Sequence, residues 1–320
     1  MNKENLPYVY GPVPSRRLGQ SLGVSPIPPK TCNYSCVYCQ IGRTTNFTNT
    51  RQDFFPREDI LDNVIHVLES DISLDYITFV GEGEPTLCKS LGWLIDQIKA
   101  LSTKPISVIT NGALLSNAKV RNELLDADVI LPTLDAVDQS LFKRVNRPIK
   151  GLHIDDIIDG MSLFREMFSG EIWMEVMLVK NLNDGEENIA DLKKVLDTLH
   201  SDRVYVNVPI RPPAEPWVQI PPHKRVMEIC ETLGATNISN YEDEEGFHID
   251  KRKRFTEQIL TITQRHPLRE NQIMKMTDLS EPKVKKLLQE MAADKKLRKV
   301  IYNEKTFWIS AESSIKDLQE

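Results

Sequence analysis

From residue 21 to about residue 209, the chain alternates short β-rich runs with longer stretches of helical periodicity. The runs expected to form strands are Leu22–Ile27, Tyr76–Val80, Ile106–Ile109, Val129–Leu134, Ile172–Val179 and Val204–Val208. The expected helices are Arg57–Leu68, Leu91–Leu101, Ala118–Leu125, Ile154–Phe168 and Glu186–Leu199. Because helices join the strands, the strands should run parallel, with helices covering one face of the sheet or both. Six strands are fewer than the eight of a closed barrel, so the alternation predicts an α/β fold with an open parallel sheet, either a partial (β/α)6 barrel or a doubly wound sheet.

The length and composition of the chain fit one large domain and one smaller domain. With 320 residues, of which 40% are hydrophobic and 27% charged, the chain can fill a sizeable core and a second, smaller one. Its first twelve residues show no signal-peptide pattern, and no run approaches the roughly eighteen apolar residues of a membrane span. We therefore expect a soluble cytoplasmic protein with no membrane segment.

The charge of the chain changes sign near residue 250. Residues 251–320 hold 16 Lys and Arg against 10 Asp and Glu, whereas residues 1–250 hold 24 against 36. The acidic run Glu242–Glu245 is followed closely by the basic run Lys251–Arg254. This change predicts a boundary between a large domain, residues 1–250, and an accessory domain, residues 251–320. The basic run is either a solvated face or part of a nucleic-acid-binding surface.

The last 65 or so residues show a pattern of their own. Expected helices at Phe255–Arg265, Leu268–Met276 and Glu281–Met291 precede two β-rich runs, Leu297–Tyr302 and Thr306–Ile309, which should form a hairpin. This order resembles a winged helix-turn-helix. Such domains bind DNA, RNA or peptides, or only pack on a neighbouring domain, so the pattern predicts a fold but not a ligand.

Three of the five cysteines lie close together, directly after the first expected strand. Cys32, Cys36 and Cys39 offer three thiolates. Four ligands are needed to fill the coordination positions of tetrahedral zinc, or to bind every iron of a four-iron cluster, so one position would stay open. A zinc site would need a fourth ligand from Cys88, Cys230 or a histidine, none of which lies in a second paired motif. Cys88 and Cys230 lie on helical patterns and are expected to be core thiols. An iron cluster with one open iron, free to bind a chelating small molecule, fits the spacing better than zinc or a disulfide framework.

Three motifs together resemble the radical S-adenosylmethionine (radical SAM) superfamily. The Cys-x3-Cys-x2-Cys spacing, with Tyr38 before the last cysteine, resembles the cluster motif of that superfamily. "VGEGEPTL" (Val80–Leu87) resembles its Gly-Gly-Glu-Pro motif, with Glu82 in place of the first glycine. "ITNGALL" (Ile109–Leu115) resembles the segment below the ribose of the cofactor.

The resemblance implies two cofactors and a radical reaction. Cys32, Cys36 and Cys39 would ligate a 4Fe-4S cluster. The residues expected to bind S-adenosyl-L-methionine (SAM) are Tyr38, Gly83, Glu84, Pro85, Asn111 and Asp135. An electron from the cluster would cleave SAM and give a 5′-deoxyadenosyl radical, which takes hydrogen from the substrate. A one-electron reductant similar to flavodoxin or ferredoxin would be a partner.

A narrower resemblance covers residues 11–180. "GPVPSRRLGQSLGV" (Gly11–Val24), "TLDAVD" (Thr133–Asp138), "NRP" (Asn146–Pro148) and "EVMLVKNLND" (Glu175–Asp184) are similar to a group of iron-sulfur oxidoreductases related to the tRNA wyosine synthases. Those synthases carry additional cysteines for a second cluster. This chain has none before Cys32, which disfavours the wyosine reaction.

Several of these residues also have a purely structural interpretation. Asp135 would cap a helix that begins near Val137, and Asn111 would simply form a turn with the glycine that follows it. Arg16 and Arg17 either bind the substrate or pair with the acidic domain. Lys180 is a surface residue or a substrate contact at a strand end.

The function predicted from these features is a radical SAM enzyme that modifies a large substrate. RNA, including tRNA, is favoured because a basic accessory domain would hold a polyanion near the strand ends. Modification of a peptide or protein is the alternative. A third hypothesis, an iron-sulfur transcription regulator, leaves Gly83, Glu84 and Pro85 without a role and is therefore disfavoured.

Overall fold

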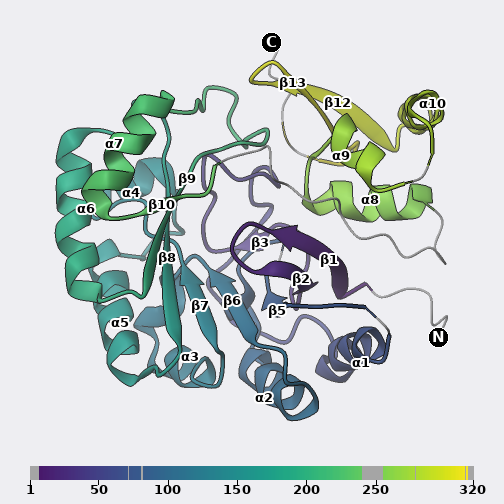
Figure 1. Ribbon diagram of the computed structural model, residues 1–320. Coiled ribbons are helices and arrows are strands. Elements are labelled where there is room, and N and C mark those ends of the chain that lie inside the picture. Colours follow the sequence, from purple (N-terminus) through teal and green to yellow (C-terminus); the bar gives the residue numbers. More distant parts are fainter. Residues whose placement is uncertain are drawn as a thin grey trace.

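The computed structural model of the protein describes residues 7–70, 72–80, 82–239, 255–277, 279–313 and 315. The strands of the main sheet are β1 (Val9–Ser15), β2 (Gly19–Val24), β5 (Tyr76–Phe79), β6 (Ile106–Thr110), β7 (Val129–Pro132), β8 (Glu171–Met177), β9 (Arg203–Asn207) and β10 (Thr236–Asn237). Within the described residues they lie in the order β1-β2-β5-β6-β7-β8-β9-β10 (Figure 1). β1 runs antiparallel to β2, and the other neighbouring pairs run parallel. The mostly parallel α/β sheet predicted from the sequence is confirmed.

All six strands expected from the sequence are present, and the sheet extends beyond them at both edges. β1 was not expected because Pro12 and Pro14 interrupt its β-rich pattern. A strand at the edge of a sheet tolerates proline, since one side of it needs no ladder hydrogen bonds. β10 has only two residues, too few to give a pattern.

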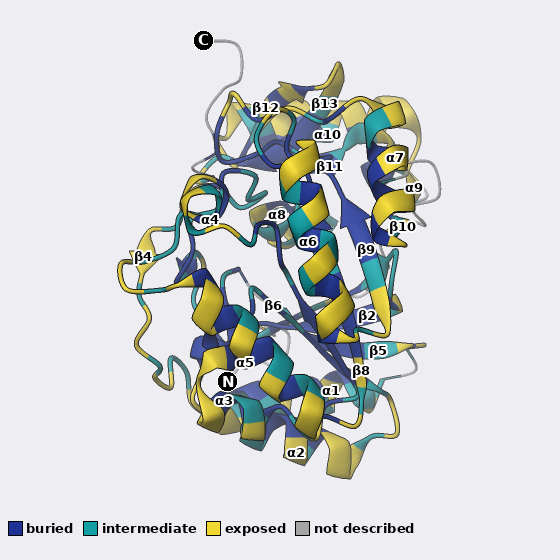
Figure 2. Ribbon diagram, turned by 90° about the vertical axis from the view of Figure 1, so that its left-hand side faces the viewer, coloured by how far each residue is buried: buried dark blue, intermediate teal, exposed yellow. Residues whose placement is uncertain are grey.

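Helices between the strands cover the outer side of the sheet (Figure 1). They are α1 (Arg57–Leu68), α2 (Leu91–Leu101), α3 (Ala118–Glu123), α4 (Gln139–Val145), α5 (Ile154–Met167), α6 (Glu186–Leu199) and α7 (His223–Leu233). On α6, Ile189, Leu192 and Leu196 are buried, whereas the opposite face is exposed (Figure 2). Such a stripe, repeated every 3.6 residues, holds an amphipathic helix on the core. The five helices expected in this region are present, with small differences at their ends.

Four short elements lie near the carboxyl ends of the parallel strands. They are β3 (Thr31–Cys32), β4 (Asn46–Phe47), η1 (Pro85–Leu87) and η2 (Ala113–Ser116). β3 follows β2, η1 follows β5 and η2 follows β6. Because neighbouring parallel strands end at the same edge, segments far apart in the sequence meet there, as ligand sites of α/β proteins do.

The C-terminal segment, residues 255–277 and 279–313, forms three helices and a small sheet. Its elements are α8 (Phe255–Arg265), β11 (Leu268–Arg269), α9 (Glu270–Lys275), α10 (Glu281–Ala293), β12 (Leu297–Tyr302) and β13 (Lys305–Ser310). The expected helix over residues 268–276 is wrong at its start, because Leu268 and Arg269 pair with Trp308 and Phe307 as a third strand. The segment has its own buried cluster, which includes Ile259, Leu288 and Trp308.

The C-terminal segment lies beside the β1–β2 hairpin, with α8 nearest to it (Figure 1). Val13 of β1 packs against the buried cluster of the C-terminal segment. Gln40 Nε2 donates a hydrogen bond of 3.4 Å to the backbone oxygen of Arg265 on α8. The acidic and basic runs that mark the expected boundary, residues 242–245 and 251–254, lie outside the described residues. Every helix in the described part of the chain is too short or too polar to cross a membrane.

Candidate active site

The cysteine loop, residues 30–42, leaves the sheet after β2 and carries its three thiols on partly buried positions. Two side-chain amides point at the sulfurs: Asn111 Nδ2 lies 3.6 Å from Cys32 Sγ, and Asn146 Nδ2 lies 3.6 Å from Cys36 Sγ. The backbone N–H of Tyr34 lies 3.4 Å from Cys32 Sγ. Donors of this kind stabilise thiolates and tune a metal that the thiolates bind.

The thiols of the cysteine loop have little tendency to ionise by themselves. Burial raises the pKa of Cys32, Cys36 and Cys39 above the ordinary value for a thiol. A bound metal supplies the positive charge that displaces the protons. No three His, Cys, Asp or Glu side chains among the described residues gather around a single ion position. Three thiols on one loop, with amide donors beside Cys32 and Cys36, are a donor set that fits an iron-sulfur cluster, in which each cysteine binds a different iron.

The Glu82–Pro85 loop, which follows β5, packs directly on the cysteine loop. The backbone N–H of Glu84 donates to the oxygen of Thr31 at 3.0 Å, and that of Lys30 donates to the oxygen of Glu82 at 2.5 Å. A Cβ atom added at Gly83 would lie 1.8 Å from the oxygen of Thr31. Only glycine, which has no Cβ atom, permits this close approach, so the contact explains why position 83 holds a glycine.

The Glu84 carboxylate joins the ends of two strands. Its Oε1 accepts hydrogen bonds from Thr86 N at 3.1 Å and from the hydroxyls of Thr86 and Thr110, both at 2.6 Å. Its Oε2 accepts from Asn111 N at 2.7 Å. Burial raises the pKa of Glu84, and the hydrogen bonds oppose this effect. Glu84 also caps η1, which begins at Pro85.

A second network joins the cysteine loop to the ends of β7 and β8. The Tyr38 hydroxyl donates to Asp135 Oδ2, which also accepts from Asn146 Nδ2 at 2.6 Å. Asp135 Oδ1 accepts from Met177 N at 2.8 Å. Burial raises the pKa of Asp135 to about 6. The helix-cap interpretation of Asp135 is wrong, because Asp138 caps α4 instead.

The predicted residues therefore form two connected groups on either side of the cysteine loop. Cys32, Glu84 and Asn111 belong to one group, and Asn111 Nδ2 also donates to Asn33 at 2.6 Å. The other group consists of Cys36, Tyr38, Asp135 and Asn146, in which the Asn146 amide contacts all three of the others.

Comparison with known families decides which superfamily the chain belongs to. The model of the radical SAM superfamily matches residues 27–192, more than half of the chain. The chain belongs to the radical SAM superfamily. The matched span contains the cysteine loop, the Glu82–Pro85 loop and both connected groups of predicted residues.

Two curated relatives and one solved structure are similar to this chain. UPF0026 protein MJ1312 of Methanocaldococcus jannaschii is 37% identical over 307 residues, which are 94% of this chain and 95% of the relative. UPF0026 protein slr1464 of Synechocystis sp. is 39% identical over 207 residues, covering 64% of this chain and 77% of the relative. A radical SAM methyltransferase from Sphaerobacter thermophilus superposes with a TM-score of 0.53 at 16% identity, covering 70% of this chain and 67% of the methyltransferase. That last similarity shows the fold alone.

As a radical SAM protein, the chain is an enzyme of a superfamily that uses a 4Fe-4S cluster and SAM. Members of the superfamily take the electron for the cluster from an external reductant. The predictions of an enzyme, of these two cofactors and of a required reductant are therefore confirmed. The identity of the reductant stays a prediction.

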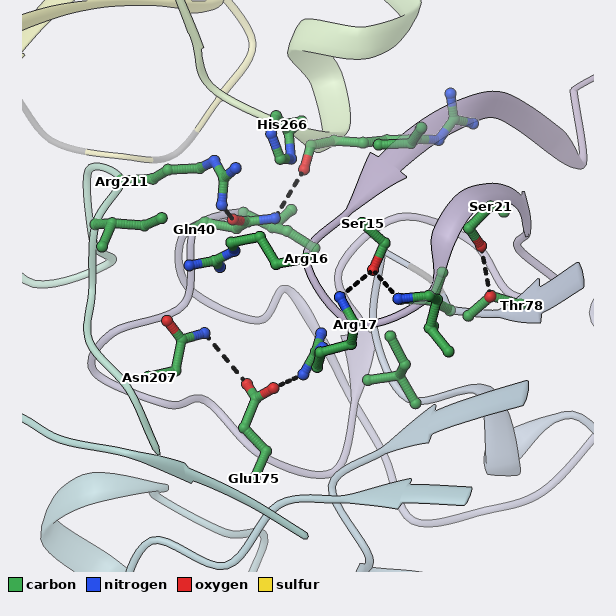
Figure 3. A pocket seen from close by; sticks show the side chains of 18 of the residues that line it. Ser15, Arg16, Arg17, Ser21, Gln40, Thr78, Glu175, Asn207, Arg211 and His266 are labelled. Carbon is green, nitrogen blue, oxygen red and sulfur yellow. Dashed lines mark hydrogen bonds and ion pairs between the residues drawn. The ribbon is translucent and has the colours of Figure 1, made fainter. Parts of the chain in front are cut away.

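A cavity of about 360 Å³ adjoins the cysteine loop of this radical SAM protein (Figure 3). Tyr38, Cys39 and Gln40 form part of one wall. The rest of the lining comes from the β1–β2 hairpin, the strands, the loop after β9 and α8 of the C-terminal segment. The cavity is therefore closed by elements from both ends of the chain. Its lining residues Gln40, Asn207, Arg211, Arg265 and His266 were not predicted from the sequence, because no local pattern marks them.

The remaining predictions are met in part. Arg17 forms an ion pair with Glu175, and Arg16 donates a hydrogen bond to the backbone oxygen of Ile238. Both arginines also line the cavity, so each has a contact within the protein and a position beside the space for a ligand. Lys180 donates to Gln219 at 3.3 Å and does not line this cavity. Cys88 and Cys230 are only 2% and 5% exposed, and both lie in the main core, as predicted.

Glu82, which replaces a glycine of the superfamily motif, pairs with the C-terminal segment. Its Oε2 lies 3.3 Å from Nε of Arg265, and the two side chains are only 7% and 13% exposed. The Arg265 guanidinium also lies over the ring of Tyr10, 5.1 Å from its centre. A buried charge pair of this kind fixes the position of α8 against the Glu82–Pro85 loop.

Removing the Arg265 charge is expected to loosen this contact. Arg265→Gln leaves Glu82 buried without a counter-charge, which should cost roughly 3–5 kcal/mol of stability and speed amide hydrogen exchange in α8. The double variant Glu82→Gly/Arg265→Gln removes both charges and should recover about 0.5–3 kcal/mol relative to the sum of the single variants. Denaturant unfolding and hydrogen exchange measure both effects. Strictly additive single effects would contradict the pairing.

Proposed function

We propose that Cys32, Cys36 and Cys39 hold the 4Fe-4S cluster, while Tyr38, Gly83, Glu84, Pro85, Asn111 and Asp135 shape the SAM site. The observation that carries this proposal is the packing of the Glu82–Pro85 loop on the cysteine loop, with Gly83 against Thr31. When bound, the cluster supplies the electron that cleaves SAM to a radical able to take hydrogen from a substrate. The chain's own residues hold the thiolates with amide donors and close the site against water.

The proposal has a direct test. Reduced, anaerobically reconstituted protein should convert SAM to 5′-deoxyadenosine, which chromatography and mass spectrometry detect. A protein that takes up its cluster but gives no 5′-deoxyadenosine would contradict the proposed assignment of the SAM-binding residues.

We further propose that residues 1–250 are a catalytic domain built as a partial (β/α)6 barrel and that residues 251–320 are a winged-helix accessory domain. The three helices, the β12–β13 hairpin and the separate buried cluster of the C-terminal segment support the second assignment. The open order of the main sheet, which ends at β1 and β10, supports the first.

For the substrate, we propose RNA. The cavity lies between the cysteine loop and α8, so a molecule held by the C-terminal segment can reach into it. Its described lining includes Arg16, Arg17, Arg211 and Arg265, a composition suited to phosphate groups. A peptide or protein substrate is the competing outcome of the tests below.

RNA binding by the intact protein is expected to weaken as salt rises, because each neutralised phosphate releases counterions. Lys283, Lys285 and Lys286 lie on α10. Lys285 pairs with Glu281 at 2.6 Å, and Lys286 lies 3.9 Å from Glu290, so these lysines must exchange partners to reach phosphates. Replacing all three with glutamine should flatten the salt slope by up to about one unit per lost contact.

Filter binding of total cellular RNA across a salt series measures this slope. Replacing three exposed lysines of the main domain, Lys104, Lys119 and Lys150, gives the matched control and should leave the slope unchanged. Salt-independent binding, or identical curves for wild type and the α10 variant, would remove RNA binding by α10 and put the peptide substrate first.

A further inference from the structure

We infer that Arg16, Arg17 and Arg211, here called the arginine wall, form the seat for an anionic group of the substrate. The inference rests on the proposed function and makes it more specific. In an RNA substrate the group is a phosphate, and in a peptide it is a carboxylate. The three side chains come from the β1–β2 hairpin and from the loop after β9, and all three line the cavity (Figure 3).

The arginine wall lies next to the expected reaction centre. Gln40 directly follows Cys39, and its Oε1 accepts a hydrogen bond from Arg211 Nη1 at 3.3 Å. Figure 3 shows Arg16 beside this pair, on the same side of the cavity. An anion held by the arginine wall would therefore fix the rest of a substrate beside the cysteine loop. Such positioning is how binding far from the reacting atoms contributes to catalysis.

The charges around the cavity favour an anion. The described lining residues include four arginines and two glutamates, with no lysine or aspartate. Glu175 pairs with Arg17 and Glu82 pairs with Arg265, so the lining keeps an excess of two positive charges. Burial, together with the nearby charge of Arg16, lowers the pKa of Arg17 to about 10. Burial, together with the charges of Arg211 and Arg16, also lowers the pKa of His266. Neighbouring positive charges in a buried site disfavour one another's charged forms, which is why these pKa values fall. A negative group that binds beside them favours the charged forms again.

SAM does not account for the arginine wall. Its sulfonium and ammonium groups outweigh its single carboxylate, so a row of guanidinium groups would repel the molecule as a whole. Of the residues expected to bind SAM, Tyr38 lines the cavity, whereas the other five do not: Gly83, Glu84, Pro85, Asn111 and Asp135. The arginine wall therefore serves a different molecule.

The size and chemistry of the cavity define that molecule further. Its volume of about 360 Å³ is near the lower end of the range for small-molecule sites, roughly 300–1,000 Å³. This is room for about one nucleotide, but not for a duplex. Guanidinium groups bind phosphate oxygens in pairs, with defined geometry. An RNA substrate would thus place one unpaired nucleotide in the cavity, as enzymes that act on bases commonly require.

The test measures binding to the full-length, cluster-reconstituted protein by calorimetry. The probes are the four nucleoside 5′-monophosphates, the four matching nucleosides and a short acidic peptide. At least one monophosphate should bind about 10-fold or more tightly than its nucleoside, and Arg16→Gln and Arg211→Gln should each weaken that binding by about 10- to 150-fold. Arg211→Lys keeps the positive charge but loses the paired hydrogen-bond geometry, so it should weaken monophosphate binding less than Arg211→Gln does.

Arg203→Gln is the matched control, because Arg203 begins β9 at the opposite end from the loop that carries Arg211. This variant should bind the probes like wild type. Equal binding of nucleosides and monophosphates, or an equal loss in Arg203→Gln, would overturn the inference. Binding of the acidic peptide alone, with the same dependence on Arg16 and Arg211, would uphold the anion seat and replace RNA by a peptide.

The experiment also separates this inference from the proposed chemistry. If wild type forms 5′-deoxyadenosine but binds none of the probes, the anion seat is wrong and the cluster and SAM assignments stand. If wild type binds a monophosphate with the expected dependence on Arg16 and Arg211 but forms no 5′-deoxyadenosine, the anion seat stands and the SAM assignment is wrong.

Discussion

Cys36→Ala is expected to abolish the brown absorbance of the iron-sulfur cluster after anaerobic reconstitution. Three thiolates bind three of the four irons and leave the fourth iron open. Removing one thiolate leaves only two protein ligands for the cluster. Asn146 Nδ2, which lies 3.6 Å from Cys36 Sγ, loses one of its three contacts at the same time. Cys32→Ala and Cys39→Ala should give the same near-complete loss. Visible absorbance and iron content per chain measure the effect.

Cys88→Ala and Cys230→Ala provide matched controls for this loss. Both thiols lie in the main core, 2% and 5% exposed, and removing either should cost some stability without changing iron content. If Cys88 or Cys230 proves as necessary as Cys36, the open-iron assignment fails and a closed four-cysteine site replaces it.

Glu84→Ala is expected to reduce both stability and SAM binding. The change leaves the four hydrogen bonds to the carboxylate without an acceptor, at roughly 1–3 kcal/mol for each buried donor. A net loss of about 4 kcal/mol lowers Tm by roughly 6 °C in a chain of this size. Since the same carboxylate is expected to receive the SAM ammonium group, SAM affinity should fall by about 10-fold or more.

Calorimetry on the reconstituted protein gives the SAM affinity, and thermal unfolding gives Tm. Glu187→Ala on the exposed face of α6 is the control and should change neither by a measurable amount. A stable Glu84→Ala variant with unchanged SAM affinity would remove the Glu82–Pro85 loop from the cofactor site.

The parallel part of the fold could be predicted from the sequence because its information is local. Each strand of the main sheet from β2 to β9 carries its own apolar run, and each helix such as α6 carries its own apolar stripe. β1 and β11 could not be predicted in this way. β1 contains two prolines, and the two residues of β11 become a strand only because β13, nearly forty residues later, offers its edge.

The same distinction applies to the candidate site. The cysteine spacing and the Gly83–Pro85 segment are contiguous in sequence, so a motif identifies them. Arg211, Arg265 and His266 reach the cavity from a loop and a helix late in the chain, where single arginines and histidines follow no pattern. The contact between Glu82 and Arg265 also needed the structure, although the missing glycine at position 82 was visible in the sequence.

The position of α8 has a consequence for how the protein is made. The cysteine loop and the Glu82–Pro85 loop leave the ribosome early, whereas Arg265 and His266 emerge near the end of synthesis. Domains generally fold as units, starting from the amino-terminal side. The growing chain therefore exposes the cysteine loop before α8 can pack beside it. If this loop holds the cluster as proposed, its thiols are more accessible to iron during translation than after α8 is in place.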